Sequence, residues 1–138
     1  MTVVFADAGY WIALFNPRDA LHAKAIVASQ TIQAQSIVTS QMVLAEFLNH
    51  YACMGSQFRQ RAVEVVKSLQ QAPEVCIIQQ TDEQFTKALN FYAQRQDKEW
   101  GFTDCASFLI MQQRGILKAL AYDDHFRQAG FIAVLRDR

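Results

Sequence analysis

Four acidic residues stand where a charged side chain is unfavourable unless it has a partner: Asp7, Glu46, Asp104 and Asp123. Asp7 and Asp123 each follow directly on an apolar stretch typical of a buried strand. Glu46 lies inside the apolar segment 42–48, and Asp104 falls in the first turn of a strongly apolar helix. Four such positions in one short chain indicate a site built from carboxylates.

The chemistry that these carboxylates suggest is the binding of a hard divalent cation. Two carboxylates that converge to about 4 Å repel each other by roughly 4 kcal/mol at an effective dielectric constant near 20, so a cluster favours an incoming positive charge. Oxygen ligands of this kind suit Mg²⁺ or Mn²⁺. A bound cation of this type can lower the pKa of an attacking water, which is a hydrolytic chemistry.

Each acid also has an ordinary structural explanation. Asp7 fits a turn, Asp104 and Asp123 fit the N-terminal ends of helices, and Glu46 fits a solvent-facing position on its helix. The conjunction of the four, rather than any one of them, favours a metal site.

Other hydrolytic sites receive less support. The histidines His22, His50 and His125 lack the HExxH spacing of zinc hydrolases, and His125 is interpreted as a packing or capping residue. The chain has no glycine-rich phosphate loop and no GxSxG elbow. A phosphatase with an aspartyl nucleophile would want Asp-x-Asp, whereas Gly9 stands two residues after Asp7.

Apolar runs and turn residues predict the elements that position these acids. Thr39 or Ser40 is expected to cap the third helix, Gly55 to end it, Thr81 or Asp82 to cap the fifth and Thr103 to cap the sixth, which should be the most buried helix. The strands are expected at 3–6, 36–38, 75–78, 119–122 and 131–135. Helices are expected at 10–15, 19–32, 57–71, 104–114 and 125–129, with one more that carries Val43 to Tyr51 and one that runs past Tyr92.

This alternation predicts an α/β fold in which a parallel sheet of four to five strands lies between two layers of helices. In such a sheet the carboxyl ends of the strands form a ligand-binding crevice, which would bring Asp7 and Asp123 to one edge. A length of 138 residues with 51% hydrophobic content supports one domain over residues 1–138.

Composition constrains the partners and the location. Thirteen basic and thirteen acidic residues cancel, so any contact with nucleic acid must be local. The cysteines Cys53, Cys76 and Cys105 are expected to be buried, reduced packing residues. Neither a signal peptide nor a membrane-spanning run is recognised, which predicts a cytoplasmic protein.

Four segments in this order resemble the motifs of the PIN-domain family, and within it the VapC-like toxins of prokaryotic toxin–antitoxin pairs. The resemblance spans nearly the whole chain and is carried by residues 4–25, 38–46, 100–111 and 119–131. It implies a PIN-like three-layer α/β/α fold with Asp7, Glu46 and Asp104 as core metal-binding acids and Asp123 as a more variable fourth. Thr103 would supply a neighbouring hydroxyl that helps to orient the site, and Gly9 departs from the Ser, Asn or Thr common there in the family.

The resemblance further implies a Mg²⁺- or Mn²⁺-dependent ribonuclease, a VapB-like antitoxin that covers the crevice, and a homodimer formed through helical regions. Aromatic residues such as Trp11 or Phe102 could accept splayed nucleotides of RNA. The candidates for phosphate contact are Arg59, Arg61, Lys67, Arg95 and Lys98.

Two other functions remain open at this point. The first is a catalytically inactive PIN-like module with an RNA-binding or regulatory role, in which the acids are vestigial. The second is a metal-dependent phosphatase or DNA nuclease on a similar scaffold.

Overall fold

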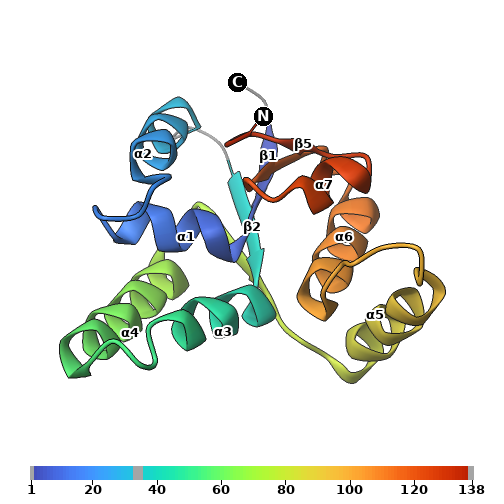
Figure 1. The fold of residues 1–138 in the computed structure, drawn as a ribbon, viewed down its shortest axis with the longest axis horizontal. Helices are drawn as coiled ribbons and strands as arrows, with labels where there is room; N and C mark the ends of the chain where they lie inside the picture. Colours follow the sequence, from blue (N-terminus) through green and yellow to red (C-terminus); the bar gives the residue numbers. More distant parts are fainter. Residues whose placement is uncertain (1, 33–35, 137–138) are drawn as a thin grey trace.

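A five-stranded, fully parallel sheet forms the centre of the protein, as the computed structural model describes it for residues 2–32 and 36–136 (Figure 1). The strand order is β3-β2-β1-β4-β5. The strands are β1 (Val3–Ala6), β2 (Ser36–Ser40), β3 (Val75–Ile78), β4 (Lys118–Leu120) and β5 (Ile132–Ala133). The predicted α/β class and the parallel sheet of four to five strands are therefore confirmed.

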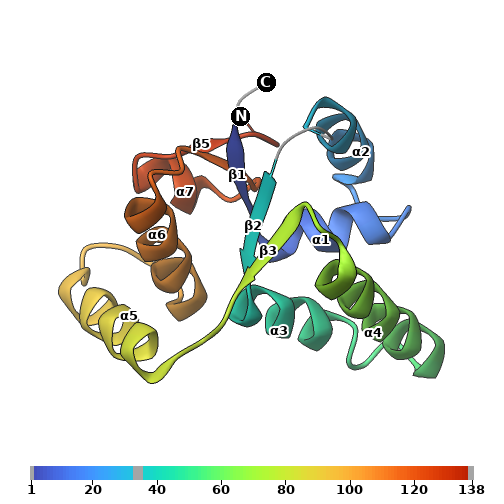
Figure 2. The same cartoon turned by 180° about the vertical axis from the view of Figure 1, so that it is seen from behind.

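Helices cover both faces of the sheet. Figures 1 and 2 show α1, α2 and α4 on one side and α5, α6 and α7 on the other, while α3 lies beyond the end of β2. The helices are α1 (Ala8–Phe15), α2 (His22–Thr31), α3 (Gln41–His50), α4 (Ser56–Gln71), α5 (Asp82–Gln94), α6 (Phe102–Arg114) and α7 (Asp124–Gln128). None of the helices in the described residues combines the length and the apolar character needed to cross a bilayer.

The central strand β1 is apolar because both of its faces are covered. Val4, Phe5 and Ala6 are almost inaccessible to solvent, as expected for a strand in the middle of a sheet with helices on each side. The same arrangement explains why α6 is apolar around most of its circumference, with Cys105, Phe108 and Met111 among its buried residues.

The chain changes direction across the sheet at β1. From β1 it moves outward to β2 and β3, and it then returns to place β4 on the other side of β1. The backbone N–H of Asp7 donates to the carbonyl oxygen of Leu120 over 3.2 Å, so the ends of β1 and β4 lie directly side by side. Open α/β sheets bind ligands at such a switch point, outside the carboxyl ends of the strands.

Two of the expected caps differ in the structure. Ser40 caps α3, since its Oγ accepts from the backbone N–H of Val43 over 3.1 Å, whereas Thr39 is fully buried and bonds elsewhere. Gly55, expected to end α3, instead precedes α4 as its N-cap with a φ of 98°. A left-handed backbone is accessible to glycine at either end of a helix, which is why the sequence alone misplaced it.

Two helix starts also differ. The predicted helix from Asp19 begins only at His22, because Asp19 Oδ1 accepts from the backbone N–H of Leu21 and forms a turn. Helix α6 begins at Phe102 with Gly101 as its N-cap, so Thr103 lies inside the first turn and is not a cap. Thr81 caps α5 as predicted.

The expectation for the cysteines was wrong at two of three positions. Cys105 is buried in α6, whereas Cys53 and Cys76 are exposed. Cys76 lies on β3, the outer strand of the sheet, and Cys53 follows the end of α3. An apolar neighbourhood in sequence did not reveal that these two positions face outward.

Candidate metal centre

Asp7 occupies the position where β1 passes directly into α1. Its backbone carbonyl oxygen accepts from the N–H of Tyr10 and of Trp11, and its side chain does not cap α1, although the neighbouring backbone N–H of Ala8 is close enough to favour its ionised form. The carboxyl group therefore stays available at the carboxyl edge of the sheet. The nearby chain is fixed by Thr39, whose hydroxyl donates to the carbonyl oxygen of Ala6 over 2.9 Å.

Asp104 stands in the first turn of α6, which runs antiparallel to β4 and so begins at the same edge. Its Oδ2 accepts from the backbone N–H of Gly101 over 3.1 Å. This bond satisfies one of the free N–H groups at the helix start, and the helix dipole favours the negative charge there.

Asp123 and His125 complete the cluster from the short helix that follows β4. Asp123 is the N-cap of α7, and its Oδ1 accepts from the backbone N–H of His125 over 3.0 Å. His125 Nδ1 lies 3.0 Å from Asp104 Oδ2 and 3.4 Å from Asp123 Oδ1. Among the described residues, these three offer ligand atoms that all lie within 4.8 Å of one another.

Glu46 lies in the middle of α3 and faces solvent, which matches the alternative reading of this position. Its charge nevertheless contributes to raising the pKa of Asp7. Asp7 and Glu46 fall outside the tight group of Asp104, Asp123 and His125. The four predicted acids are therefore close enough for the charges of three of them to act on the fourth, Asp7. Two of them, Asp104 and Asp123, both contact His125.

Asp7 shows the electrostatic cost of this arrangement most clearly. Burial raises the pKa of its carboxyl group, the charges of Asp104, Glu46 and Asp123 raise it further, and a hydrogen bond from the backbone of Ala8 opposes them. The resulting pKa is about 7, compared with an ordinary value of 3.8. A cation placed among these groups would oppose both causes, because its positive charge stabilises the ionised carboxylate that burial and the neighbouring acids make unfavourable.

Aromatic packing holds α6 and α7 in a fixed relation. The ring of Phe108 lies 5.0 Å from that of Trp100, 5.0 Å from that of Phe126 and 5.7 Å from that of Phe131. The first two are edge-on contacts, and aromatic pairs of this kind stabilise a protein by about 0.5–1.5 kcal/mol beyond the area that they bury. Since Asp104 and His125 sit on these two helices, the packing fixes the spacing between them.

The residues present fit a divalent cation. Asp104 Oδ1 and Asp123 Oδ2 accept no hydrogen bond from any described residue, and both belong to a group of oxygen donors suited to a hard ion. Thr103 is half-buried beside them, and its hydroxyl makes no hydrogen bond within the described part of the chain.

The two aromatic residues considered for RNA contact differ in exposure. Trp11 is 5% exposed and donates through Nε1 to Thr39 Oγ1, so it is a core residue. Phe102 is half-buried at the start of α6, with its ring 4.9 Å from that of Phe85 and 6.2 Å from that of Tyr92. Only Phe102 of the two has a surface that a nucleotide can reach.

Most of the basic residues considered for phosphate contact have other contacts. Arg59 donates to the carbonyl oxygen of Ala52, and Arg61 lies over the ring of Phe15. Arg95 binds both carboxylate oxygens of Asp97 at 3.0 and 3.1 Å and stacks on Trp100. Lys67 and Lys98 form no ion pair with the other described residues.

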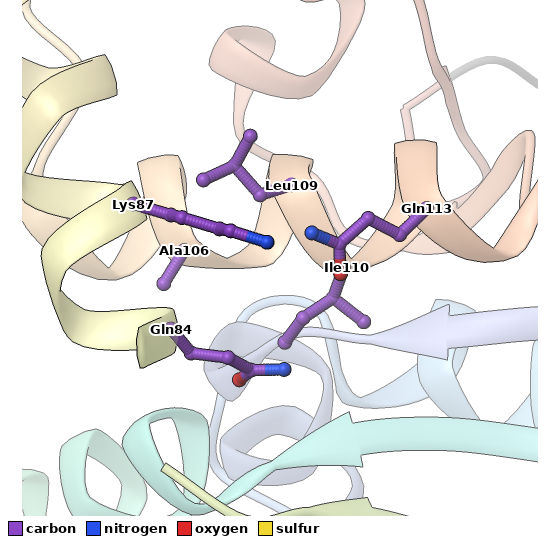
Figure 3. Close-up of a pocket in the computed structure, with 6 residues that line it drawn as sticks. All are labelled: Gln84, Lys87, Ala106, Leu109, Ile110 and Gln113. Atoms are coloured by element: carbon purple, nitrogen blue, oxygen red, sulfur yellow. The ribbon is translucent and has the colours of Figure 1, made fainter. Parts of the chain in front are cut away.

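Two crevices adjoin the helices near the cluster. A cavity of about 320 Å³ is lined by Asp97, Lys98, Glu99, His125 and Gln128, and it shares His125 with the acidic cluster. A narrower crevice between α5 and α6 is lined by Gln84, Lys87, Ala106, Leu109, Ile110 and Gln113 (Figure 3). The second crevice has no carboxylate in its lining, so the first is the one adjoining the candidate metal centre.

Comparison with known proteins identifies the family. A family model described as the PIN domain matches residues 4–132. The chain belongs to the PIN-domain family. As a PIN domain it is a nuclease, a hydrolase of phosphodiester bonds.

Two comparisons give the same relative. The 23S rRNA-specific endonuclease VapC20 of Mycobacterium tuberculosis is 29% identical over 134 residues, which are 96% of this PIN domain and 98% of the relative. The crystal structure of M. tuberculosis VapC20, described as a sarcin-ricin loop cleaving toxin, superposes with a TM-score of 0.79. It is 27% identical, and the alignment covers 94% of this chain and 97% of that structure.

His125 is the member of the cluster that sequence reasoning missed. It was interpreted as a packing or capping residue because the histidines of the chain lack zinc-ligand spacing. The available signal was its position two residues after Asp123 in a short helix, which places its ring beside the acid that caps that helix.

Proposed function

We propose that this PIN domain is a Mg²⁺- or Mn²⁺-dependent endoribonuclease and the toxin of a VapBC-type toxin–antitoxin pair. One observation carries the proposal: Asp104 at the start of α6 and Asp123 in the turn after β4 lie together at the switch point of the sheet, where Asp7 directly follows β1. Burial and these neighbouring acids raise the pKa of Asp7. The full-length similarity to VapC20 supports RNA as the substrate.

The chain's own residues have separate roles in this proposal. Asp7, Glu46, Asp104 and Asp123 would hold the cation, which when bound would supply the positive charge that polarises a phosphate and favours ionisation of an attacking water. Asp7 must lose its proton to act as a ligand, because a protonated carboxyl is a poor one. Thr103 provides a hydroxyl close to Asp104 that can orient water or substrate.

The substrate is proposed to be single-stranded RNA or a loop of structured RNA. Phe102 offers a partly exposed ring two residues from Asp104, on which an unstacked base can lie. Lys98 lines the cavity that adjoins His125 and has no ion-pair partner among the described residues, so its ammonium group can meet a phosphate. Since RNA of this kind lies in the cytoplasm, we place the activity there.

A VapB-like antitoxin is proposed to cover the acidic crevice and to dock a helix on the face formed by α1 and α4. A groove of about 400 Å³ runs there, lined by Trp11, Leu14, Phe15, Arg61, Glu64, Val65, Ser68 and Leu69. A mostly apolar groove between two helices accepts the apolar face of a partner helix.

A homodimer is proposed to form through α5. Phe85, Leu89 and Tyr92 follow one another at helical spacing, and they are 48%, 49% and 50% exposed. An apolar stripe of this kind is typical of a surface that is covered in an assembly.

Cleavage of labelled RNA tests the proposal. The panel contains single-stranded RNAs and a sarcin-ricin loop fragment, incubated with Mg²⁺, Mn²⁺ or EDTA and with wild type, Asp104→Asn or Asp82→Asn. Asp82 is an exposed acid in the first turn of α5 and serves as the matched control. Metal-dependent cutting that Asp104→Asn abolishes and Asp82→Asn retains is expected, whereas metal-independent RNA binding without cutting by any protein would favour the inactive RNA-binding module.

A further inference from the structure

We propose that His125 is a positioning residue of the acidic site, whose Nδ1–H group holds one oxygen of Asp104 and leaves the other for the cation. This inference rests on the proposed function and explains how one of its carboxylates is oriented. It concerns the residue that links Asp104 and Asp123 in the structure.

The direction of the hydrogen bond follows from the chemistry of the two groups. An ionised carboxylate can only accept, so the proton between His125 Nδ1 and Asp104 Oδ2 is carried by the nitrogen. The distance of 3.0 Å is that of an ordinary N–H···O hydrogen bond. His125 is therefore the donor, both as a neutral ring with the proton on Nδ1 and as an imidazolium.

The two oxygens of Asp104 have different surroundings. Oδ2 receives the N–H of Gly101 at 3.1 Å and the Nδ1–H of His125 at 3.0 Å. Oδ1 accepts no hydrogen bond from the described residues. Two donors on one oxygen fix the rotation of the carboxylate, so Asp104 presents Oδ1 as a single ligand atom.

His125 also reaches the second acid of the cluster. Its backbone N–H donates to Asp123 Oδ1 over 3.0 Å, and its Nδ1 lies 3.4 Å from the same oxygen. One residue thus contacts one oxygen of each carboxylate, through the ring and through the backbone. The distance between the two remaining oxygens, which would be left to bind a cation, therefore depends on where His125 is held.

The ring of His125 is held in place by its surroundings. The next residue, Phe126, is fully buried and packs on Phe108 of α6. The side chain of His125 is 27% exposed, and it forms part of the lining of the polar cavity together with Lys98 and Gln128. A ring fixed in this way can orient a carboxylate without a large entropic cost.

Direct ligation by Nδ1 is a different arrangement. It would require the nitrogen to lose its proton, and Asp104 Oδ2 would then keep only the N–H of Gly101. Mg²⁺ and Mn²⁺ favour oxygen donors, whereas imidazole suits later transition metals better. The observed geometry therefore assigns the ring to support of a ligand rather than to the metal itself.

Two substitutions distinguish the effect of the Nδ1–H donor from that of the rest of the imidazole ring. In His125→Asn the amide nitrogen can take the place of Nδ1, and in His125→Gln it takes the place of Nε2. Removal of a residue that supports a metal ligand weakens metal affinity by roughly 10–100-fold. We expect Mn²⁺ affinity to fall by this factor in His125→Gln and to stay close to that of wild type in His125→Asn.

The measurement is Mn²⁺ titration followed by electron paramagnetic resonance, without RNA, on proteins whose thermal unfolding is first compared. His50→Gln, an exposed histidine at the end of α3, is the control and should bind as wild type does. Equal losses in His125→Asn and His125→Gln would overturn the proposal, as would ¹⁴N coupling that shows an imidazole bound to Mn²⁺ in wild type. Wild type that binds Mn²⁺ but cuts no RNA would instead refute the proposed function and leave this inference standing.

Discussion

The hydroxyl of Thr39 donates to the carbonyl oxygen of Ala6 over 2.9 Å, which ties the end of β2 to the last residue of β1. The hydroxyl oxygen of Thr39 in turn accepts from Trp11 Nε1 over 3.2 Å, so β1 before Asp7 and α1 after it both bond to this one buried hydroxyl. Thr39 is fully buried. This polar contact determines where the first acid of the site lies.

Thr39→Val should destabilise the protein although it preserves shape. The substitution leaves the N–H of Trp11 and the carbonyl group of Ala6 without this partner, and each unsatisfied buried group costs about 1–3 kcal/mol. Urea unfolding is the measurement, with Thr31→Val as the control. Thr31 is exposed and its hydroxyl donates to the carbonyl oxygen of Val27 in its own helix, so its loss should change stability by less than about 0.5 kcal/mol. Similar stabilities for the two variants would contradict this role of Thr39.

The sequence predicted the fold well because its strongest signals are local. The apolar runs that became β1 and β3 have the predicted bounds, and the helix at 57–71 begins one residue earlier than expected. Local signals were ambiguous at Gly55, which suits both a helix end and a helix start, and at Thr39 and Ser40, which are adjacent residues with similar hydroxyls. The tertiary structure decides that Ser40 caps α3 and that Thr39 is buried against β1.

The four acids could be proposed as a site from the sequence because carboxylates next to apolar runs are unusual, and the parallel sheet predicted a common edge for two of them. The contact between His125 and Asp104 was not predictable, since 21 residues separate them and nothing in the spacing indicates that α7 packs beside the start of α6. The exposure of Glu46 also required the structure, because a helix within an apolar segment can present either face to solvent.

Asp7 should make the stability of the metal-free protein fall as pH rises from about 4 to about 7. Its pKa is about 7 in the folded protein and near 3.8 when unfolded, so over this range the folded state keeps a proton that the unfolded state has lost. Each unit of difference corresponds to roughly 1.4 kcal/mol. In urea unfolding with EDTA, the free energy of unfolding of Asp7→Asn relative to that of wild type should increase up to pH 7 and stay constant above it. A difference that does not vary with pH would show that Asp7 is not perturbed.

Cation binding should release a proton from Asp7 below neutral pH. Because a ligand carboxylate must be ionised, the affinity for Mn²⁺ should rise by up to about tenfold per pH unit below 7 and level off above it. Calorimetry in two buffers of different ionisation enthalpy measures the protons released. In Asp123→Asn the release should shift to lower pH, since one of the charges that raise the pKa of Asp7 is gone. An affinity independent of pH from about 5.5 to 8 would be inconsistent with this coupling.

A charge introduced on α5 should separate the proposed homodimer. Leu89 is 49% exposed in the middle of the stripe, and Leu89→Glu would place an ionised group in an apolar contact, which weakens association by roughly 2 kcal/mol or more. Sedimentation analysis over a range of concentrations measures the change. Leu117→Glu is the matched control, because Leu117 is 66% exposed and lies outside α5. A wild-type protein that is monomeric at all concentrations, or a Leu89→Glu protein that stays dimeric, would exclude this interface.

Gly9→Ser should tighten cation binding. Gly9 is exposed in the first turn of α1, and a Cβ built there has no atom within 4 Å, so a side chain fits without strain. A hydroxyl two residues after Asp7 can donate to the ionised carboxylate, which favours the charged form that the cation needs. Gly9→Ala is the control, since it gives a comparable gain in helix propensity without the hydroxyl. Higher Mn²⁺ affinity in Gly9→Ser than in Gly9→Ala would show that the hydroxyl acts on Asp7, whereas equal affinities would assign any change to the stability of α1 alone.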